Sequence, residues 1–125
     1  MTPVFTEFER TFLLGARLAR IATASAAGVP DVAAVTFVVD RDTIVTGGYD
    51  ITRTVRYRNL LANPLATIVI DDLASVEPWR PRGVKVRGSA SIEEHRSGLK
   101  IRIVPQVVWS WGLDPETVGV HRRDV

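Results

Sequence analysis

The sequence predicts a mainly β protein with short helices, built around a small antiparallel barrel of six strands. Short apolar segments, either alternating or β-branched, recur along the chain between turns rich in Gly, Pro and Asp. Only two segments carry the start and stop signals of helices. At 125 residues, with 46% of them hydrophobic, the whole chain (residues 1–125) is expected to form a single domain.

The first helix is expected over residues 6–14. Thr6 can cap it, Glu9 completes a capping box, and Gly15 follows the last turn. Its apolar face is expected to consist of Phe8 and Phe12, with Phe5 beside them.

Three strands in a meander are expected next. Residues 18–24 alternate, and residues 31–39 form the second strand after a turn at 26–30. Residues 40–42 form a tight turn into the third strand, at 43–46.

A second helix is expected over residues 52–62, because Pro64 marks its exit. The β-branched run at 65–70 predicts a strand buried on both faces, and residues 71–81 are expected to form a loop.

An amphipathic strand is predicted at 83–92, with Lys85 on its polar side. Glu93 and Glu94 are expected to begin a short helix. Residues 101–111 form the last strand, in which Pro105 marks an edge or a bend. The polar tail from Asp114 is expected to be frayed.

Composition excludes several functions. A net charge of +2 is too small to indicate a nucleic-acid partner, and the absence of cysteine removes thiol chemistry and suits a reducing, cytoplasmic location. No apolar run reaches the roughly 20 residues that span a membrane. His95 and His121 are too far apart in the sequence to predict a metal site. No Ser-His-Asp set or paired carboxylate is visible, so no catalytic residue is assigned and a cofactor is expected to carry the reaction.

The segment from residue 50 to 59 is the main candidate for ligand binding. It follows Thr46 and Gly47, and it places basic, hydroxyl and amide groups in the first turns of a helix. Unpaired N–H groups and arginine side chains together bind phosphate well. A solvated helix face is the alternative for these residues, as an ordinary turn is for Gly47-Gly48. The candidate anion-binding residues are Arg53, Thr54, Arg56 and Asn59.

An ordered set of short motifs resembles a known family. The set comprises Ala22-Thr23, Gly28–Pro30, Val35–Phe37, Arg56–Asn59, Asn63-Pro64, Ala66–Asp71 and Gly83–Ala90. The chain in this respect is similar to the pyridoxamine 5′-phosphate oxidase-like (PNPOx-like) split β-barrel flavoproteins. It is closest to their actinobacterial branch that binds the deazaflavin coenzyme F420. Residues 103–113 resemble a subgroup that includes a reductase of tetracycline biosynthesis.

The resemblance implies a homodimeric FMN-binding-type split barrel with the cofactor at the dimer interface. A barrel this small fills its own interior, so a cleft between subunits also agrees with its size. In the family, the phosphate is held by the helix after the third strand, which here carries the four candidates named above. The resemblance places the ring of the cofactor against Val35, Thr36, Thr46 and Gly47. Relatives carry a basic residue where this chain has Thr54, so Arg53 or Arg58 is expected to replace that contact.

Trp79 and Lys85 have two interpretations each, and Trp109 is expected to have a packing role. Trp79 either forms a pocket wall across the dimer or packs in a surface loop. Lys85 either meets the acidic tail of the cofactor or faces water. Trp109, two residues from Trp111 and on the same face, is expected to contribute to core or dimer packing.

The resemblance implies hydride transfer from reduced F420 to a small organic substrate, with a proton from solvent or from Tyr49 or Tyr57. Two rivals remain: an FMN-dependent oxidoreductase of the same fold, and a non-catalytic protein that sequesters a cofactor or a haem-like ligand.

Overall fold

The computed structural model describes residues 2–125, which form seven strands and three short helical segments. In chain order these are α1 (Glu7–Gly15), β1 (Leu18–Ala24), β2 (Pro30–Asp40), β3 (Thr43–Thr46), the 3₁₀ turn η1 (Ile51–Arg53), α2 (Val55–Ala62), β4 (Leu65–Ser75), β5 (Arg80–His95), β6 (Gly98–Trp111) and β7 (Val120–Asp124).

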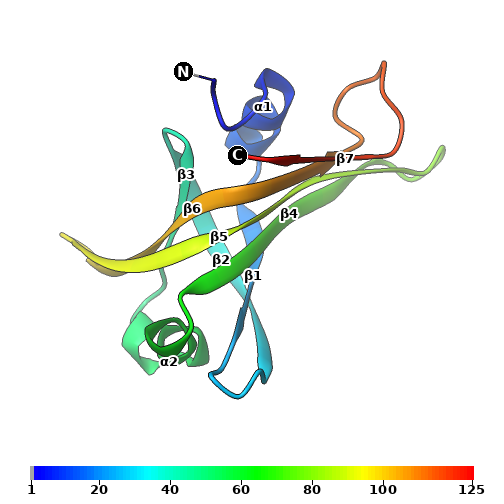
Figure 1. Cartoon of the computed structure of the whole chain (residues 1–125). Helices are drawn as coiled ribbons and strands as arrows, with labels where there is room; N and C mark the ends of the chain where they lie inside the picture. Colours follow the sequence, from blue (N-terminus) through cyan, green and yellow to red (C-terminus); the bar gives the residue numbers. More distant parts are fainter. Residues whose placement is uncertain (1) are drawn as a thin grey trace.

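The predicted six-stranded antiparallel barrel is confirmed (Figure 1). The strand order is β3-β2-β1-β4-β5-β6-β7, and β3 also pairs with β6, which closes β1 to β6 into a barrel. The β1–β2–β3 meander pairs as expected. β7 lies outside the closed barrel as an added strand beside β6.

The core fills the barrel interior with side chains from alternating strand positions. Successive side chains of a strand point to opposite faces of the sheet, so every second residue points into the barrel and its neighbours point outward. Fully buried members include Ile21, Ile44, Ile68, Ile70, Val84, Val86, Ile101, Ile103 and Val108. No space for a large ligand remains within this packed interior, which agrees with a binding site on the outside of the barrel.

Helix α1 covers one side of this core with its capping box intact. Thr6 Oγ1 accepts from the Glu9 amide at 3.1 Å, and Glu9 Oε1 accepts from the Thr6 amide at 3.0 Å. Phe5 and Phe12 are buried as predicted, but Phe8 is 51% exposed. The apolar face of this helix therefore turns from Phe12 toward its neighbour Leu13, which is buried, and away from Phe8.

Several predicted boundaries in the second half were wrong because two long hairpins extend beyond the barrel. β4 continues to Ser75 and β5 begins at Arg80, so most of the predicted loop at 71–81 is strand. Glu93 and Glu94 start no helix, because β5 continues to His95 and pairs with β6. Backbone pairing with a neighbouring strand thus outweighs the weak local preference of these polar residues.

The strand at 65–70 also differs from the expectation. It is buried on one face only: Ala66, Ile68 and Ile70 enter the core while Leu65 is 48% exposed. The barrel is antiparallel, so its outer face stays open to solvent. Pro105 does mark a bend, since the β5–β6 register shifts beside it.

The tail was predicted to be frayed, but residues 120–124 form β7. Arg123 fastens this strand to α1. Its Nη1 donates to Glu9 Oε2 at 2.8 Å, and its Nη2 donates to the carbonyl of Val4. Burial raises the pKa of Glu9, but hydrogen bonds from Arg123, Ser110 and Thr6 outweigh it and lower the pKa overall.

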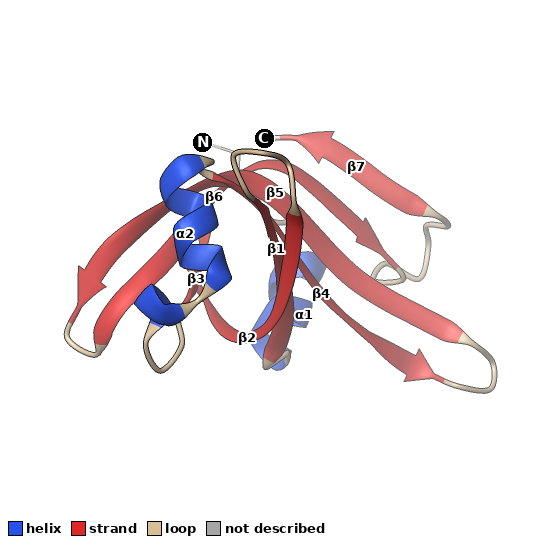
Figure 2. Cartoon of the chain, turned by 90° about the horizontal axis from the view of Figure 1, so that it is seen from below, coloured by secondary structure: helices blue, strands red, loops and turns tan. Residues whose placement is uncertain are grey.

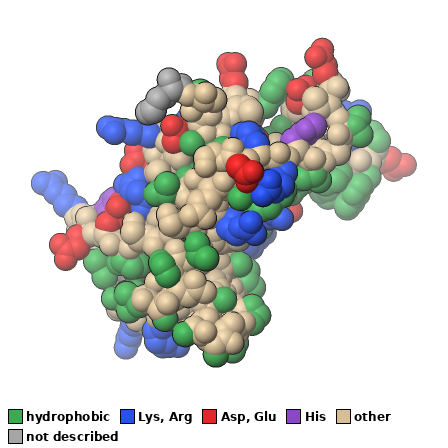
Figure 3. Space-filling model, in the orientation of Figure 1, with side chains coloured by type: hydrophobic (Ala, Val, Ile, Leu, Met, Phe, Trp, Pro, Cys, Tyr) green, Lys and Arg blue, Asp and Glu red, His purple; other side chains and the backbone are tan. Residues whose placement is uncertain are grey.

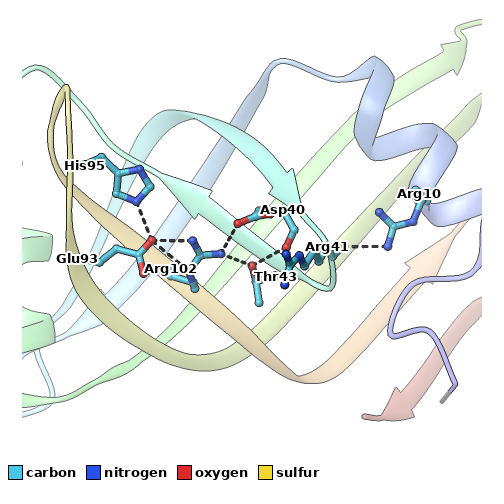
Figure 4. A network of polar contacts seen from close by, with 7 residues as sticks. All are labelled: Arg10, Asp40, Arg41, Thr43, Glu93, His95 and Arg102. Atoms are coloured by element: carbon cyan, nitrogen blue, oxygen red, sulfur yellow. Dashed lines mark hydrogen bonds and ion pairs between the residues drawn. The ribbon is translucent and has the colours of Figure 1, made fainter.

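A second arginine network closes the barrel between the β2–β3 hairpin and the β5–β6 hairpin (Figure 4). Arg102 donates to Asp40 at 2.8 Å, to Thr43 at 2.7 Å and to Glu93 at 2.7 Å. Hydrogen bonds from Arg102 and then His95 lower the pKa of Glu93 to about 2. The bonds from Arg102 to Asp40 and Thr43 join residues 62 and 59 positions apart in the sequence and help to hold the β3–β6 seam. The bond to Glu93 lies within the β5–β6 hairpin.

Within residues 2–125 no helix is long and apolar enough to cross a membrane.

Candidate anion site beside Gly47 and Gly48

The structure forms the predicted helix as two pieces. Asp50 Oδ1 accepts from the amide of Thr52 at 3.1 Å and caps the 3₁₀ turn. Thr54 then caps α2, because its Oγ1 accepts from the Tyr57 amide at 3.2 Å. The Thr54 hydroxyl also donates to the carbonyl of Ile51 at 2.6 Å. The Thr54 hydroxyl therefore donates one hydrogen bond and accepts another within the fold.

Arg56 is the most unusual residue of this region. It is only 9% exposed, and its Nη2 donates to the carbonyl of Gly47 at 3.1 Å. Its Nε is buried with no hydrogen-bond partner, and in the chain from residue 2 onward no carboxylate lies within 4.0 Å of its guanidinium. Burial lowers its pKa, and the more distant Asp31 partly opposes that change. Arginine nevertheless stays charged, so this is a buried cation without a counter-ion.

The two glycines give the cations room. A Cβ on Gly48 would lie 2.8 Å from Arg56 Nη2, and a Cβ on Gly47 would lie 2.9 Å from Lys100 Nζ. A side chain at either position would therefore require the end of the Arg56 or Lys100 side chain to shift. An adjoining cavity of about 390 Å³ is lined by residues 48–51 and 97–99.

Asn59 supports the site from the helix. Its Nδ2 donates to Thr23 Oγ1 at 3.0 Å, and both side chains are buried. This bond joins α2 to β1 and fixes the helix across the open end of the barrel. Asn59 thus positions Arg56 in this structure, because both lie on the buried face of the same two helical turns.

The predicted ring-contact residues lie on both faces of the sheet. Val35 is buried in the core, whereas Thr36 is exposed. Thr46 is buried and its Oγ1 donates to the carbonyl of Thr36 at 2.6 Å. Of these four residues, Gly47 contacts Arg56 through its carbonyl, and Thr46 precedes it in the chain.

Three other predicted site residues lie away from this cluster. Arg53 is exposed in the 3₁₀ turn. Trp79 is 66% exposed at the tip of the β4–β5 hairpin, which lies far from α2 in Figures 1 and 2. Lys85 lies on the outer face of β5. Within one chain the structure does not bring Trp79 or Lys85 together with Arg56.

Lys85 belongs to a basic cluster around Trp109. Its Nζ lies 4.3 Å from the centre of the Trp109 ring, and Arg87 and Arg122 approach within 5.3 and 5.8 Å. Cross-strand pairing of Lys85, Trp109 and Arg122 produces this arrangement. Figure 3 shows Lys and Arg side chains gathered over this part of the sheet. Trp109 therefore packs against cations on the outer face and takes no part in the core.

Sequence reasoning missed Thr23, Asp31 and Lys100. Each reaches the site through strand pairing between distant segments: Thr23 pairs with Asp31 across β1–β2, and Lys100 precedes the residue that pairs with Thr46 across β3–β6. No local motif marks these residues. Only the register of the closed barrel could have identified them.

Comparisons with known proteins agree with this fold. The chain is 33% identical to a 5a,11a-dehydrotetracycline/5a,11a-dehydrooxytetracycline reductase of Streptomyces rimosus subsp. rimosus, over 97% of this chain and 93% of that protein. Among solved structures, it resembles a haem-binding protein of Mycobacterium smegmatis, with a TM-score of 0.76 and 19% identity. That match covers 94% of this chain and 57% of the other.

A second solved structure matches over its full length. The FAD-binding protein of Mycobacterium smegmatis superposes with a TM-score of 0.69 at 18% identity, and all of both chains is covered. At such identities these two structures support the fold alone. Residues 5–104 match the pyridoxamine 5′-phosphate oxidase family, so this chain belongs to that family.

Proposed function

We propose that this protein is an oxidoreductase that binds coenzyme F420 through its phosphate group at Arg56 and reduces a small organic substrate. The observation that carries the proposal is the buried, uncompensated guanidinium of Arg56. An anion placed there supplies the missing counter-charge and an acceptor for Nε. The reductase from Streptomyces, 33% identical over nearly the whole chain, supports the oxidoreductase class.

The donor set fits an oxyanion such as a phosphate. Nε and the remaining N–H groups of Arg56 form a fork that can donate two parallel hydrogen bonds to a phosphate. Lys100 adds a compact charge at the neighbouring glycine. Thr54 keeps helix α2 in place rather than binding the anion, since its hydroxyl is occupied. Arg53 is exposed on the preceding turn, away from Arg56, and is not part of the proposed donor set.

Hydride transfer to an electron-poor carbon–carbon double bond is the chemistry that reduced F420 supplies. The chain contributes binding and orientation. Gly47 and Gly48 allow the backbone to approach a planar ring, and the Thr46–Thr36 bond holds the end of β3 rigid. Tyr49 is fully exposed and Tyr57 half-buried, so solvent is the proton source that the structure favours. The relative's name leads us to propose a polycyclic, conjugated ketone as substrate class. A homodimer in the cytoplasm remains part of this proposal.

Cofactor titration of the purified protein tests the proposal. F420, FMN and haem are each added and followed by absorbance and fluorescence, and the reduced form of any ligand that binds is then mixed with a conjugated polycyclic ketone. We expect F420 to bind with at least tenfold higher affinity than FMN, about 1.4 kcal/mol in binding free energy. Binding of FMN alone supports the FMN-dependent alternative. Binding of haem without turnover supports the sequestering alternative and contradicts the proposal.

A further inference from the structure

A second cavity lies at the opposite end of the barrel from α2. It has a volume of about 460 Å³ and lies between α1, the base of the β4–β5 extension and the turn at 112–113. Figures 1 and 2 show α1 and α2 on different sides of the barrel. A volume of this size is typical of sites for small organic molecules. None of the residues proposed to bind the cofactor lines it.

Two phenylalanines line this cavity. Phe12 is 8% exposed and Phe8 is 51% exposed. Leu113 contributes further apolar surface. An exposed phenylalanine beside a hollow leaves apolar area in water that a flat ring can cover.

Arg82 gives the cavity a polar wall without a free charge. Asp72 holds the guanidinium in a two-point contact, with Nε–Oδ1 at 2.6 Å and Nη2–Oδ2 at 3.0 Å. The guanidinium carbon lies 5.2 Å from the centre of the Phe12 ring. Its remaining N–H groups can donate to a ligand oxygen, and Glu7 adds a carboxylate that can accept from a hydroxyl.

The charges lining the cavity decide the class of ligand. Arg82 is balanced by Asp72, and Glu7 leaves the lining with an excess of one negative charge. An anion is therefore disfavoured, in contrast to the site at Arg56. We infer that this cavity binds a flat, uncharged, hydroxylated aromatic molecule.

Gly15 provides a way to close the cavity without disturbing the fold. It lines the cavity, and a Cβ built on it meets no atom within 4 Å. Leucine is also a better helix former than glycine, so Gly15→Leu is expected to keep α1 intact while occupying the space. Leu14→Ala is the matched control, because Leu14 is 67% exposed on the same helix and does not line the cavity.

The test is a titration of cofactor-free protein with 2-naphthol, followed by amide chemical shifts in ¹H–¹⁵N spectra. We expect shifts at residues 15 and 112–113, and an affinity at least about threefold higher for 2-naphthol than for 2-naphthoate because of the negative lining. Gly15→Leu should lower the affinity by about tenfold or more because its side chain occupies the cavity, and Phe8→Ala should do so because it removes contact area. Leu14→Ala should leave the affinity unchanged.

Four results would overturn the inference. The first three are shifts confined to the α2 end of the barrel, a stronger response to 2-naphthoate, and unchanged affinity in Gly15→Leu with a native spectrum. Dimerisation through this face, lost in Gly15→Leu and accompanied by no 2-naphthol binding, also overturns it. Because no cofactor is present, the outcome is independent of whether Arg56 binds phosphate, and Arg56→Gln is expected to bind 2-naphthol normally.

Discussion

Arg56 and Arg123 lie at different ends of the barrel, and they differ in the partners of their guanidinium groups. Arg123 reaches a buried carboxylate, Glu9, and joins the last strand to the first helix. Arg56 is more deeply buried, yet it has only the Gly47 carbonyl as a partner. A buried charge is costly unless paired. The first arrangement is therefore expected to stabilise the fold, and we propose that the second receives its counter-charge from a ligand.

The largest loss of stability is expected when the Glu9–Arg123 ion pair is broken. Glu9→Gln removes the counter-charge of Arg123, and Arg123→Met leaves the Glu9 carboxylate buried alone. Each variant should lower the free energy of unfolding by about 3 kcal/mol, the lower end of the range for buried pairs because Arg123 is one-third exposed. Urea denaturation followed by circular dichroism measures this.

The double variant Glu9→Gln/Arg123→Met sharpens the comparison. It removes both charges, so it should be more stable than the sum of the two single losses predicts, by about 1 kcal/mol or more. Strict additivity would mean that the two side chains are not coupled and that the tail is held by backbone pairing alone.

Asn59 is expected to show the next largest effect. Asn59→Ala breaks its buried bond to Thr23 and leaves a hydroxyl without a partner, at a cost of about 1–2 kcal/mol. Thr23→Val is the matched variant, because it removes the same bond from the other side and keeps the volume. If Asn59→Ala unfolds at the same urea concentration as the parent, this bond does not fix α2 against the sheet.

Acid titration tests a third arginine, Arg102, which is partly buried. Arg102 holds the pKa of Glu93 at about 2, below its usual value of 4.5. This carboxylate therefore adds stability that is fully present above pH 4.5 and lost as the pH falls toward 2. The stability difference between the parent and Arg102→Gln should shrink over that interval. Urea midpoints at pH 6, 4 and 3 measure it, and a constant difference would contradict the assigned role of Arg102.

Sequence patterns predicted the barrel and its first half well, because the alternation of residues 18–46 and the capping box at Thr6 are local signals. They failed where long-range pairing decides the outcome. Residues 120–124 look like a polar tail until β6 supplies an edge and Glu9 supplies a partner for Arg123. Glu93 likewise joins a strand because its partner Arg102 lies across the hairpin.

The residues of the candidate site could likewise be predicted only where the signal is local in the sequence. Arg56, Asn59 and Gly47 could be selected from their positions in one segment, since the glycine turn and the helix start are adjacent in the sequence. Burial of Arg56, its missing carboxylate and the proximity of Lys100 depend on closure of the barrel and have no local signature. Thr54 was selected for its hydroxyl, which the structure uses to cap α2.

The most direct test of the central claim is the affinity of Arg56→Gln for F420, compared with that of Arg58→Gln, an exposed arginine on the same helix. Fluorescence titration of both variants and the parent should show a loss of about 10- to 100-fold for Arg56→Gln and little change for Arg58→Gln. The ligand-free Arg56→Gln protein should unfold within about 1 kcal/mol of the parent, because it loses one hydrogen bond together with an unpaired charge. Unchanged F420 affinity in a folded Arg56→Gln variant would contradict the claim that this buried cation binds the cofactor phosphate.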